Sequence, residues 1–338
     1  MSKVLSVCVP SYNMEKYLNR CIDSFLVPEV LDQLEIIIVN DGSTDATLSI
    51  ANEYKTKYPQ SIVVIDKPNG HYGSCVNASL KVATGKYFRI VDADDWVDSD
   101  ALATFINTLE RVNVDCVCTK RTKHDLNKNT RETDEEERIE KNIHLDKDEF
   151  PVRFLRMHNL TYLAKLLKKI NYHQTESICY TDTEYAYFPL SNAKTVEFVD
   201  VSLYQYFVGR DDQSMSPNVI NKNISHLIGV LERVLSYHQE NRCFNNNESL
   251  IFSTVVYRLL YLAVPIYILY SKKCKEFDTV LKQSIEHVEQ IGLVSLSGVF
   301  ENKFWKIPYV AIWYNNKLFS QPIIQLFRLL NRSLKLKF

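Results

Sequence analysis

The fold is decided by residues 35–45, which read Glu-Ile-Ile-Ile-Val-Asn-Asp-Gly-Ser-Thr-Asp. A continuously apolar run of this length predicts a strand that is buried on both faces, and the polar residues after it predict a turn that leads into a helix. Strands of this kind lie in parallel sheets that helices cover on both sides. The stretch therefore predicts an α/β fold.

The same alternation continues on both sides of this stretch. Short β-branched or apolar runs predict further strands, and segments with a period near 3.6 predict the helices between them. The expected strands are Leu5–Val9, Ile62–Asp66, Tyr87–Val91 and Val114–Thr119, and the expected helices are Glu15–Phe25, Thr44–Lys57, Cys75–Ala83 and Ser99–Val112. This arrangement is a Rossmann-like, mostly parallel sheet with flanking helices.

The second half of the chain changes in character. Residues 120–149 are strongly charged and predict an exposed excursion or an edge hairpin. After it we expect a helix at Pro151–Ile170, strands at Val196–Val199 and Leu203–Val208, and helices at Ile224–Tyr237, Leu250–Tyr270 and Phe277–Ile291. The predicted domains are an α/β domain over residues 1–215 and a helical C-terminal domain over residues 216–338.

Composition excludes some classes of partner and location. The net charge of −1 gives no basic field, so we expect no nucleic-acid partner. Lys3 runs directly into the first strand, which does not resemble a secretion signal, and the cysteines include no CxxC pair. These features predict a cytoplasmic protein with reduced thiols.

Two segments bear on membrane contact. Arg258 and Pro265 interrupt Leu250–Tyr270, which favours a buried core helix over a membrane span. The segment Trp305–Phe338 mixes aromatic and basic residues, as does a helix that lies on a membrane surface. A helix packed on the protein's own core, with a basic outer face, explains that composition equally well.

The polar residues after each strand are the candidates for a ligand site, because ligands bind beyond the carboxyl ends of parallel strands. After the fourth strand, residues 92–95 read Asp-Ala-Asp-Asp. These carboxylates would repel one another unless they share a cation, which predicts a divalent metal, although acidic turns without a metal are common. After the second strand, Ser43 or Thr44 can cap the next helix, but capping does not account for Asp41. That carboxylate can accept a hydrogen bond from the N–H of a nucleotide base.

Taken in order, these motifs resemble the series found in the family 2 glycosyltransferases, whose fold is called GT-A. The resemblance is carried by Val9-Pro10-Ser11-Tyr12-Asn13, by Asn40-Asp41-Gly42-Ser43-Thr44-Asp45, by Asn69-Gly70 with Asn77 and Ala83-Thr84-Gly85-Lys86-Tyr87, and by Val91-Asp92-Ala93-Asp94-Asp95-Trp96. It implies that residues 1–119 bind a nucleotide sugar and that residues 120–215 form the acceptor part.

The resemblance also implies roles for particular residues. Asp41 contacts the base, usually uracil, and Asp94 holds a Mn²⁺ or Mg²⁺ ion on the diphosphate, with Asp92 as a second candidate ligand. The implied donor-binding residues are Pro10, Tyr12, Asn13, Asp41, Lys67, Asn69, Gly70, His71, Asn77, Asp92, Ala93, Asp94 and Arg210.

Some of these positions have alternative interpretations. Val76 stands where the family often has an arginine, so His71 or Lys67 would have to compensate for the missing diphosphate contact. His71 is also explained as a turn residue between Gly70 and Gly73. Arg210 can bind phosphate through its guanidinium or be a solvated loop residue.

The catalytic base implied by the family is an aspartate that opens a helix on the acceptor side. Here it is Asp182, with Glu184 as second choice, and Thr181 replaces the usual first acid of the motif. A plain helix N-cap is the alternative interpretation of Asp182.

These inferences predict an inverting glycosyltransferase, a hexosyltransferase that moves a sugar from a UDP-sugar to an acceptor hydroxyl. The family suggests an acceptor glycan on a lipid-linked or cell-surface polysaccharide or teichoic acid precursor, met at the inner face of the membrane. A non-catalytic carbohydrate-binding or scaffold protein on the same fold and a sugar nucleotidyltransferase are the alternatives. The sequence does not decide whether the chain forms a homodimer.

Overall fold

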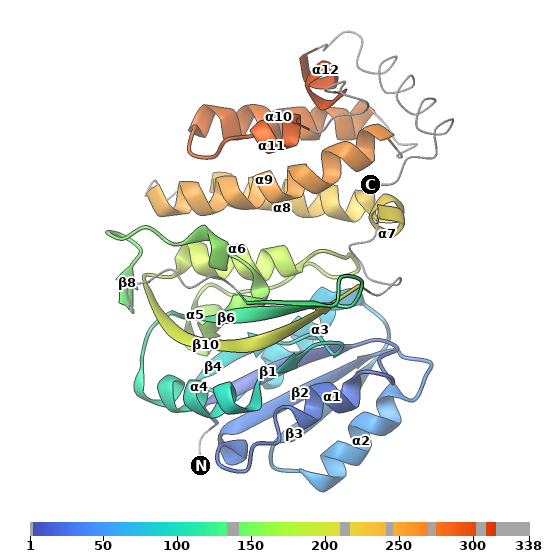
Figure 1. The fold of residues 1–338 in the computed structure, drawn as a ribbon, viewed down its shortest axis with the longest axis vertical. Helices are drawn as coiled ribbons and strands as arrows, with labels where there is room; N and C mark the ends of the chain where they lie inside the picture. Colours follow the sequence, from blue (N-terminus) through green and yellow to red (C-terminus); the bar gives the residue numbers. More distant parts are fainter. Residues whose placement is uncertain are drawn as a thin grey trace. The chain divides into compact units, whose positions relative to one another are not determined.

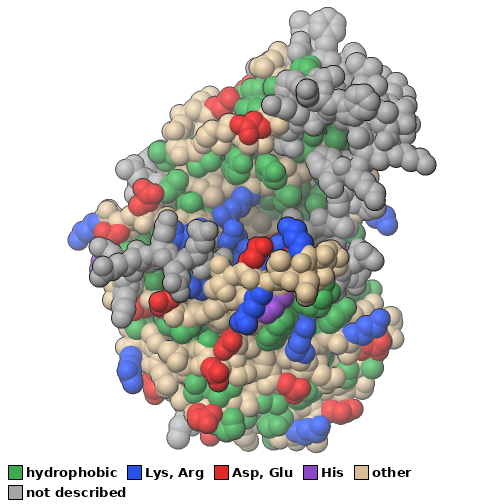
Figure 2. Space-filling view, viewed as in Figure 1, with side chains coloured by type: hydrophobic (Ala, Val, Ile, Leu, Met, Phe, Trp, Pro, Cys, Tyr) green, Lys and Arg blue, Asp and Glu red, His purple; other side chains and the backbone are tan. Residues whose placement is uncertain are grey.

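The computed structural model describes residues 3–133, 142–209, 217–240, 246–269, 275–301 and 309–315. The chain divides into two compact units, Met1–Arg210 and Asp211–Phe338. The first unit contains the sheet and the second is helical (Figure 1). Basic and acidic side chains are interspersed over the visible face of the first unit (Figure 2).

The described part of the first unit is built on a ten-stranded sheet. Its strand order is β3-β2-β1-β4-β9-β6-β10-β5, with β7 paired to β6 and β8 paired to β10. The strands are β1 Leu5–Ser11, β2 Leu34–Asp41, β3 Ile62–Lys67, β4 Tyr87–Ile90, β5 Trp96–Val97, β6 Cys116–Asp125, β7 Thr130–Thr133, β8 Asn142–His144, β9 Leu160–Leu163 and β10 Thr195–Val208.

Strands β3, β2, β1 and β4 are parallel to one another. Every residue of β2 is buried, as its apolar sequence predicts for a strand covered on both faces. The register pairs Asp41 of β2 with Lys67 of β3. The expected α/β sheet is therefore confirmed, and its carboxyl edge collects the polar residues that follow each strand.

Six α-helices accompany the sheet in the described part of this unit. They are α1 Leu18–Asp23, α2 Thr47–Lys57, α3 His71–Val82, α4 Ser99–Arg111, α5 Ala164–Lys169 and α6 Asp182–Asn192. Helix α3 packs on β2 where Cys75 meets Ile37 and Val39. Helix α4 begins where Asp98 accepts a hydrogen bond from the Ala101 N–H at 3.0 Å, a normal N-cap.

The prediction of one helix over Pro151–Ile170 is wrong. The segment consists of the 3₁₀ turns Val152–Phe154 and Met157–Asn159, the strand β9, and the short helix α5. Strand β9 runs antiparallel between β4 and β6. Its pairing on both edges outweighs the local helical pattern, because tertiary context overrides propensity.

Two further expectations change in detail. The strands expected at Val196–Val199 and Leu203–Val208 are one strand, β10, with irregular register between Val199 and Ser202. The charged excursion begins as an antiparallel hairpin of β6 and β7, in which Thr122 pairs with Thr133. Residues 134–141 of that excursion lie outside the described residues.

The second unit is helical, as expected. Its described helices are α7 Pro217–Lys222, α8 Ile224–Glu240, α9 Asn246–Leu269, α10 Lys275–Ile291, α11 Ser297–Phe300 and α12 Tyr309–Asn315. Among the residues described, one helical stretch, Asn247–Leu269, is long and apolar enough to cross a membrane, and 78% of its most apolar window is buried within the protein. Such burial is typical of a core helix.

Candidate active site

The carboxyl edge of the parallel strands joins two charged side chains from β2 and β3. The Lys67 ammonium donates a hydrogen bond to Asp41 Oδ1, and the Gly70 N–H donates to the same oxygen at 2.9 Å. Asp41 is only 3% exposed, so the ion pair compensates a carboxylate that has lost most of its solvation. Three of the predicted donor residues thus contact one another directly.

Two turns hold this edge together. Gly42 follows β2 with a φ of 72°, and a Cβ at this position would lie 2.9 Å from the Asn69 nitrogen. The Asn69 side chain donates a hydrogen bond to the Asp41 carbonyl at 3.0 Å. Only glycine fits at position 42 without strain, and the loop after β3 is bound to the end of β2.

The predicted donor residues at the end of β1 and just after it differ in how far they are exposed. Pro10 lies within β1, opposite Val39 of β2. Asn13 has a φ of 54° and accepts a hydrogen bond from the Thr44 N–H at 2.9 Å. Its side chain therefore fixes the loop to the segment that precedes α2. Tyr12 directly follows β1, the strand that pairs with β2. It is 49% exposed, so a ligand can reach its ring.

Tyrosines orient the acidic loop after β4. Asp92 Oδ1 accepts a hydrogen bond from the Tyr72 hydroxyl at 2.8 Å. The Tyr204 hydroxyl donates to Asp95 Oδ2 at 2.7 Å and accepts from the Asp92 N–H at 3.2 Å. Asp95 Oδ1 accepts from the Phe207 N–H at 2.7 Å. The β4 loop is thereby fastened to both α3 and β10.

Asp94 lies in the same loop with its side chain half-buried. Its carbonyl accepts a hydrogen bond from Arg20 Nη2 at 2.7 Å, and the Arg20 guanidinium stacks 3.9 Å from the centre of the Trp96 ring. Burial and the charges of Asp94 and Asp92 raise the pKa of Asp95 well above its usual value. Negative charge in this loop is therefore costly, which a bound cation would relieve.

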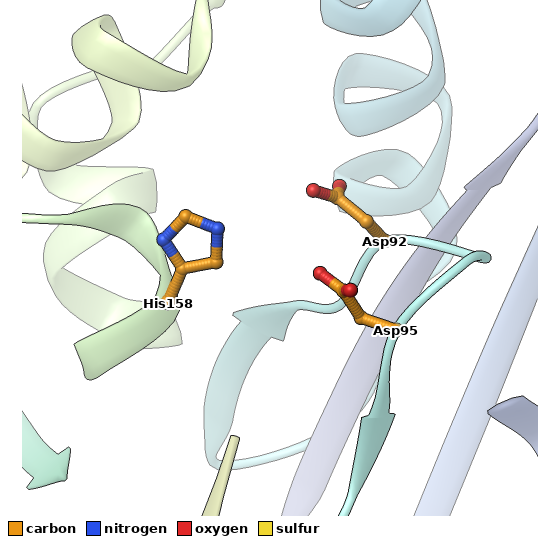
Figure 3. Close-up of side chains that lie close together, drawn as sticks. All are labelled: Asp92, Asp95 and His158. Atoms are coloured by element: carbon orange, nitrogen blue, oxygen red, sulfur yellow. The ribbon is translucent and has the colours of Figure 1, made fainter. Parts of the chain in front are cut away.

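A histidine from outside the recognised motifs faces these carboxylates (Figure 3). One ligand atom from each of Asp92, Asp95 and His158 lies within 4.8 Å of the other two. Burial, followed by the charges of nearby arginines, holds the pKa of His158 well below its usual value. The imidazole is thus neutral, which is the form that binds metals. The three side chains could hold a divalent cation.

A buried arginine, Arg89, fixes the backbone at His158. Arg89 donates hydrogen bonds to the His158 carbonyl and, at 2.7 Å, to the Thr161 hydroxyl. Burial lowers the pKa of Arg89 to about 10, so it still carries its charge at neutral pH. Asn159 donates to the Thr119 carbonyl at 2.7 Å. These contacts fix the 3₁₀ turn that carries the histidine.

Sequence reasoning missed His158 because no motif spacing marks it and because we expected a helix across it. The one usable signal is residues 160–163, Leu-Thr-Tyr-Leu, whose aromatic and β-branched content is typical of a strand. A strand at that place would have put residue 158 at the edge of the sheet.

Asp182 is the first residue of α6, and Tyr72 shows where it lies relative to the acidic loop. Burial raises the pKa of Tyr72, and the neighbouring charges of Asp92 and then Asp182 raise it further. The same hydroxyl is hydrogen-bonded to Asp92, so both carboxyl groups lie close to one tyrosine. Burial also raises the pKa of the Asp182 carboxyl. The charge of the predicted base thus acts on the same hydroxyl that binds Asp92.

Glu184, the second choice for the base, has a different environment. It is fully buried, and its Oε2 accepts a hydrogen bond from the Thr175 N–H at 2.8 Å. Asp182 is the more accessible of the two carboxylates. A base must reach the acceptor hydroxyl, so this geometry favours Asp182.

The remaining predicted residues are scattered. Asn77 is buried, and its amide is hydrogen-bonded to both backbone groups of Gln174. His71 begins α3 with a φ of 63° and an exposed side chain. Ala93 is buried within the acidic loop. Arg210 lies outside the described residues.

Comparison with known proteins places these features in context. The model of the family described as Glycosyl transferase family 2 matches residues 6–175, which is half of the chain. The minor teichoic acid biosynthesis protein GgaB of Bacillus subtilis (strain 168) is 26% identical over 312 residues, which cover 87% of this chain and 33% of GgaB. The chain spans 10% to 33% of the length of the curated relatives that it matches.

Two solved structures share the fold. TarS 1–349 of S. aureus, in complex with UDP-GlcNAc, is 19% identical with a TM-score of 0.65, and the match covers 98% of this chain and 91% of TarS 1–349. The mannosyltransferase PcManGT of Pyrobaculum calidifontis, in complex with GDP-Man and Mn²⁺, is 14% identical with a TM-score of 0.50 and coverage of 100% and 89%. The similarity to TarS confirms the expected GT-A-like sheet followed by C-terminal helices.

Proposed function

This chain belongs to glycosyl transferase family 2, and from that premise we propose that it transfers a hexose from a UDP-sugar to an acceptor hydroxyl. The observation that carries the proposal is that the acidic loop after β4 and the ion pair of Asp41 and Lys67 lie at the carboxyl ends of strands in one parallel sheet. Such an edge can bind a nucleotide on one side and activate a hydroxyl on the other.

The nucleotide side of the site is formed by Asp41, Lys67 and Tyr12. Asp41 can accept a hydrogen bond from the imide N–H of uracil, and the exposed ring of Tyr12 can stack on the base. The structural relative TarS 1–349 forms a complex with UDP-GlcNAc, which supports a UDP-sugar here. His71, Asn69 and Gly70 would complete the donor pocket.

The acidic loop fits a divalent cation such as Mn²⁺ or Mg²⁺. Its carboxylates are crowded, that of Asp95 is buried, and the neutral imidazole of His158 completes a set of ligand atoms that such ions accept. Asp94 and Asp92 are the proposed ligands toward the diphosphate, with Asp95 and His158 within reach of the same loop. When bound, the ion would neutralise the negative charge that develops on the leaving diphosphate.

Asp182 would accept the proton of the acceptor hydroxyl as the oxygen attacks the anomeric carbon. The bond between that carbon and the diphosphate breaks in the same step, so the configuration inverts and no covalent enzyme intermediate forms. Tyr72, hydrogen-bonded to Asp92 and close to Asp182, would keep the two carboxyl groups apart. A product with retained anomeric configuration would contradict this mechanism.

For the acceptor we propose a glycan on a lipid-linked or cell-surface polysaccharide or teichoic acid precursor, met at the inner face of the membrane. The 26% identity to GgaB over most of this chain supports that class. The tail that would touch the membrane falls largely within residues 302–308 and 316–338, outside the described residues.

The experiment is a panel of nucleotide sugars, each with and without Mn²⁺, scored for thermal stabilisation and for slow hydrolysis of the donor. We expect selective, metal-dependent stabilisation by one UDP-sugar. Asp41→Asn keeps the side-chain shape but replaces an acceptor oxygen with a donor group, so we expect this variant to lose the stabilisation by the UDP-sugar. A wild-type protein that responds to no nucleotide sugar would contradict the proposal and favour a non-catalytic binding protein.

A further inference from the structure

A polar segment, residues 173–176, joins α3 to the start of α6, and Gln174 at its centre is fully buried. The side-chain amide of Asn77 in α3 forms two hydrogen bonds with the backbone of Gln174, as a paired β-strand would. Its Oδ1 accepts from the Gln174 N–H at 2.9 Å, and its Nδ2 donates to the Gln174 carbonyl at 2.8 Å. Asn77 Nδ2 also donates to Glu176 Oε1 at 2.8 Å. Both N–H bonds of the Asn77 amide therefore donate to this segment.

The Gln174 side chain carries the connection onward to α6. It is fully buried, and its Nε2 donates to the Thr181 hydroxyl at 2.9 Å, while its Oε1 accepts from the Tyr172 hydroxyl at 3.1 Å. Thr181 is the N-cap residue of α6 and directly precedes Asp182. One glutamine thus links the middle of α3 to the residue beside the base.

The backbone of the same segment is bound at both ends. The Ser177 N–H donates to the Gly70 carbonyl at 2.9 Å, and the Thr175 N–H donates to Glu184 Oε2 at 2.8 Å. A Cβ on Gly73 would lie 2.0 Å from the Thr175 carbonyl oxygen. Residues 70, 73 and 77 lie on one face of α3, so that face is fitted closely to the segment.

We propose that Gln174 and Asn77 are positioning residues that fix Asp182 against the donor side of the site. This inference rests on the proposed role of Asp182 as base. The α3 face begins at Gly70, which is hydrogen-bonded to Asp41, and the relay ends at Thr181. The relay therefore connects the nucleotide edge to the base, and its central hydrogen bonds, from Asn77 through Gln174 to Thr181, join neutral groups and are buried.

Such a connection matters because transfer needs the base oxygen within hydrogen-bond reach of the acceptor hydroxyl. A displacement of the order of 1 Å can lower a rate by roughly a hundredfold. The hydrogen bonds of Gln174 and Thr181 are buried, so removal of one partner leaves the other unsatisfied and lets the start of α6 shift.

The test is a double-mutant cycle with Gln174→Met and Thr181→Val, which remove the two ends of one hydrogen bond and nearly keep their shapes. We expect each to lower kcat for transfer by roughly tenfold to a hundredfold, with metal-dependent donor binding within about twofold of wild type. The double variant should be no worse than the poorer single variant, because both break the same contact.

Hydrogen exchange provides a readout that does not depend on activity. In Gln174→Met the amides of residues 182–186 should exchange faster, while those of β1 and β2 keep their protection. Gln33→Met is the matched control, because it makes the same substitution elsewhere in the first unit and should change neither kcat nor exchange in α6.

The inference would be overturned if donor binding and kcat fell in proportion, if the two effects multiplied, or if exchange in α6 stayed at the wild-type rate. Wild type and Asp182→Asn are measured beside the variants. A wild-type protein that transfers no sugar contradicts the proposed function, whereas an active wild type with an equally active Gln174→Met contradicts the positioning role alone.

Discussion

At the scale of single residues, the acidic loop contains one carboxyl group, that of Asp95, that burial makes difficult to ionise. Asp95 is almost fully buried, and the charges of Asp94 and Asp92 raise its pKa further. Its oxygens are already hydrogen-bonded to Tyr204 and to the β10 backbone. Among these aspartates, Asp92 and Asp94 are therefore the more accessible ligands for a metal that must also reach a diphosphate.

Two substitutions separate the proposed ligands. Asp94→Asn should abolish metal-dependent donor binding, because it removes the carboxylate that the family resemblance assigns to the metal. His158→Ala should weaken Mn²⁺ binding to the free protein by roughly tenfold or more, measured by paramagnetic resonance titration. His144→Ala, which alters an exposed histidine of β8, is the control and should bind as wild type does. Unchanged Mn²⁺ affinity in His158→Ala would exclude the histidine as a ligand.

Asp182→Asn should leave donor binding intact and stop transfer, because the amide cannot accept the hydroxyl proton. In the wild type, the raised pKa of Asp182 sets the direction of the pH dependence. Transfer needs the ionised carboxyl, so activity should fall with decreasing pH at a higher pH than an ordinary aspartate would give. Near-normal transfer by Asp182→Asn would assign the base to Glu184 or another group.

The raised pKa of Asp182 also makes stability depend on pH, in the direction opposite to that of activity. A folded-state pKa above the unfolded value means that the folded protein binds the proton more tightly. The stabilising contribution of the protonated form is therefore present at low pH and is lost as the pH rises through the folded-state pKa of Asp182. Activity and this contribution to stability thus change in opposite directions.

Much of the site could be predicted because its residues directly follow strands. That rule alone selects Asp41, Asp92 and Asp94 as candidates, the resemblance adds Asp182, and their roles stay predictions. His158 could not be predicted, because Arg89 and the pairing of β9 place it from outside any motif. The contacts of Asn77 with Gln174 were also unforeseen, since they join residues far apart in the sequence.

At the scale of elements, the fit of α3 against residues 173–177 depends on the absence of a side chain at Gly73. Gly73→Ala would place a methyl group against the Thr175 carbonyl, so one backbone segment must move. We expect it to lower the free energy of unfolding by about 1–3 kcal/mol, measured by urea denaturation.

The matched control is Gly229→Ala in α8, where a Cβ would meet nothing within 4 Å. It should stabilise the protein by up to about 1 kcal/mol, because alanine favours a helix over glycine. A Gly73→Ala variant as stable as wild type would mean that the segment yields without cost and does not fix α6.

Elements of the parallel half were predictable because burial on both faces leaves an apolar signature in β1 and β2. Strand β9 was not, because its four residues obtain their conformation from β4 and β6 on either side. Strand β10 was expected as two pieces because residues 200–202, at its irregular register, interrupt the apolar pattern.

At the scale of the whole molecule, the C-terminal segment Trp305–Phe338 has two parts. The sequence alone did not show which part packs on the protein and which part is free to contact a membrane. Helix α12 buries Trp313, whose indole N–H donates to Asp278 of α10 at 2.6 Å. This part of the tail is packed on the second unit. The membrane-surface proposal therefore concerns residues 316–338, which lie outside the described residues.

Removal of residues 316–338 should move the protein from the membrane fraction to the soluble fraction, since it deletes the basic and aromatic end and keeps the packed Trp313. Thermal stability within a few degrees of the full-length value checks that the second unit is intact. If fractionation does not change, the tail is not the membrane contact.

The placement of β9 also fixes where the chain that follows β6 must rejoin the centre of the sheet. The excursion between β6 and β9 starts and finishes at fixed points of the sheet, and its strands β7 and β8 pair with β6 and β10 on the way. Because Arg89 and Asn159 anchor the returning turn to the sheet, the excursion before it can diverge in length and sequence without displacing His158. A different excursion grafted between β6 and the returning turn should therefore leave His158 in place.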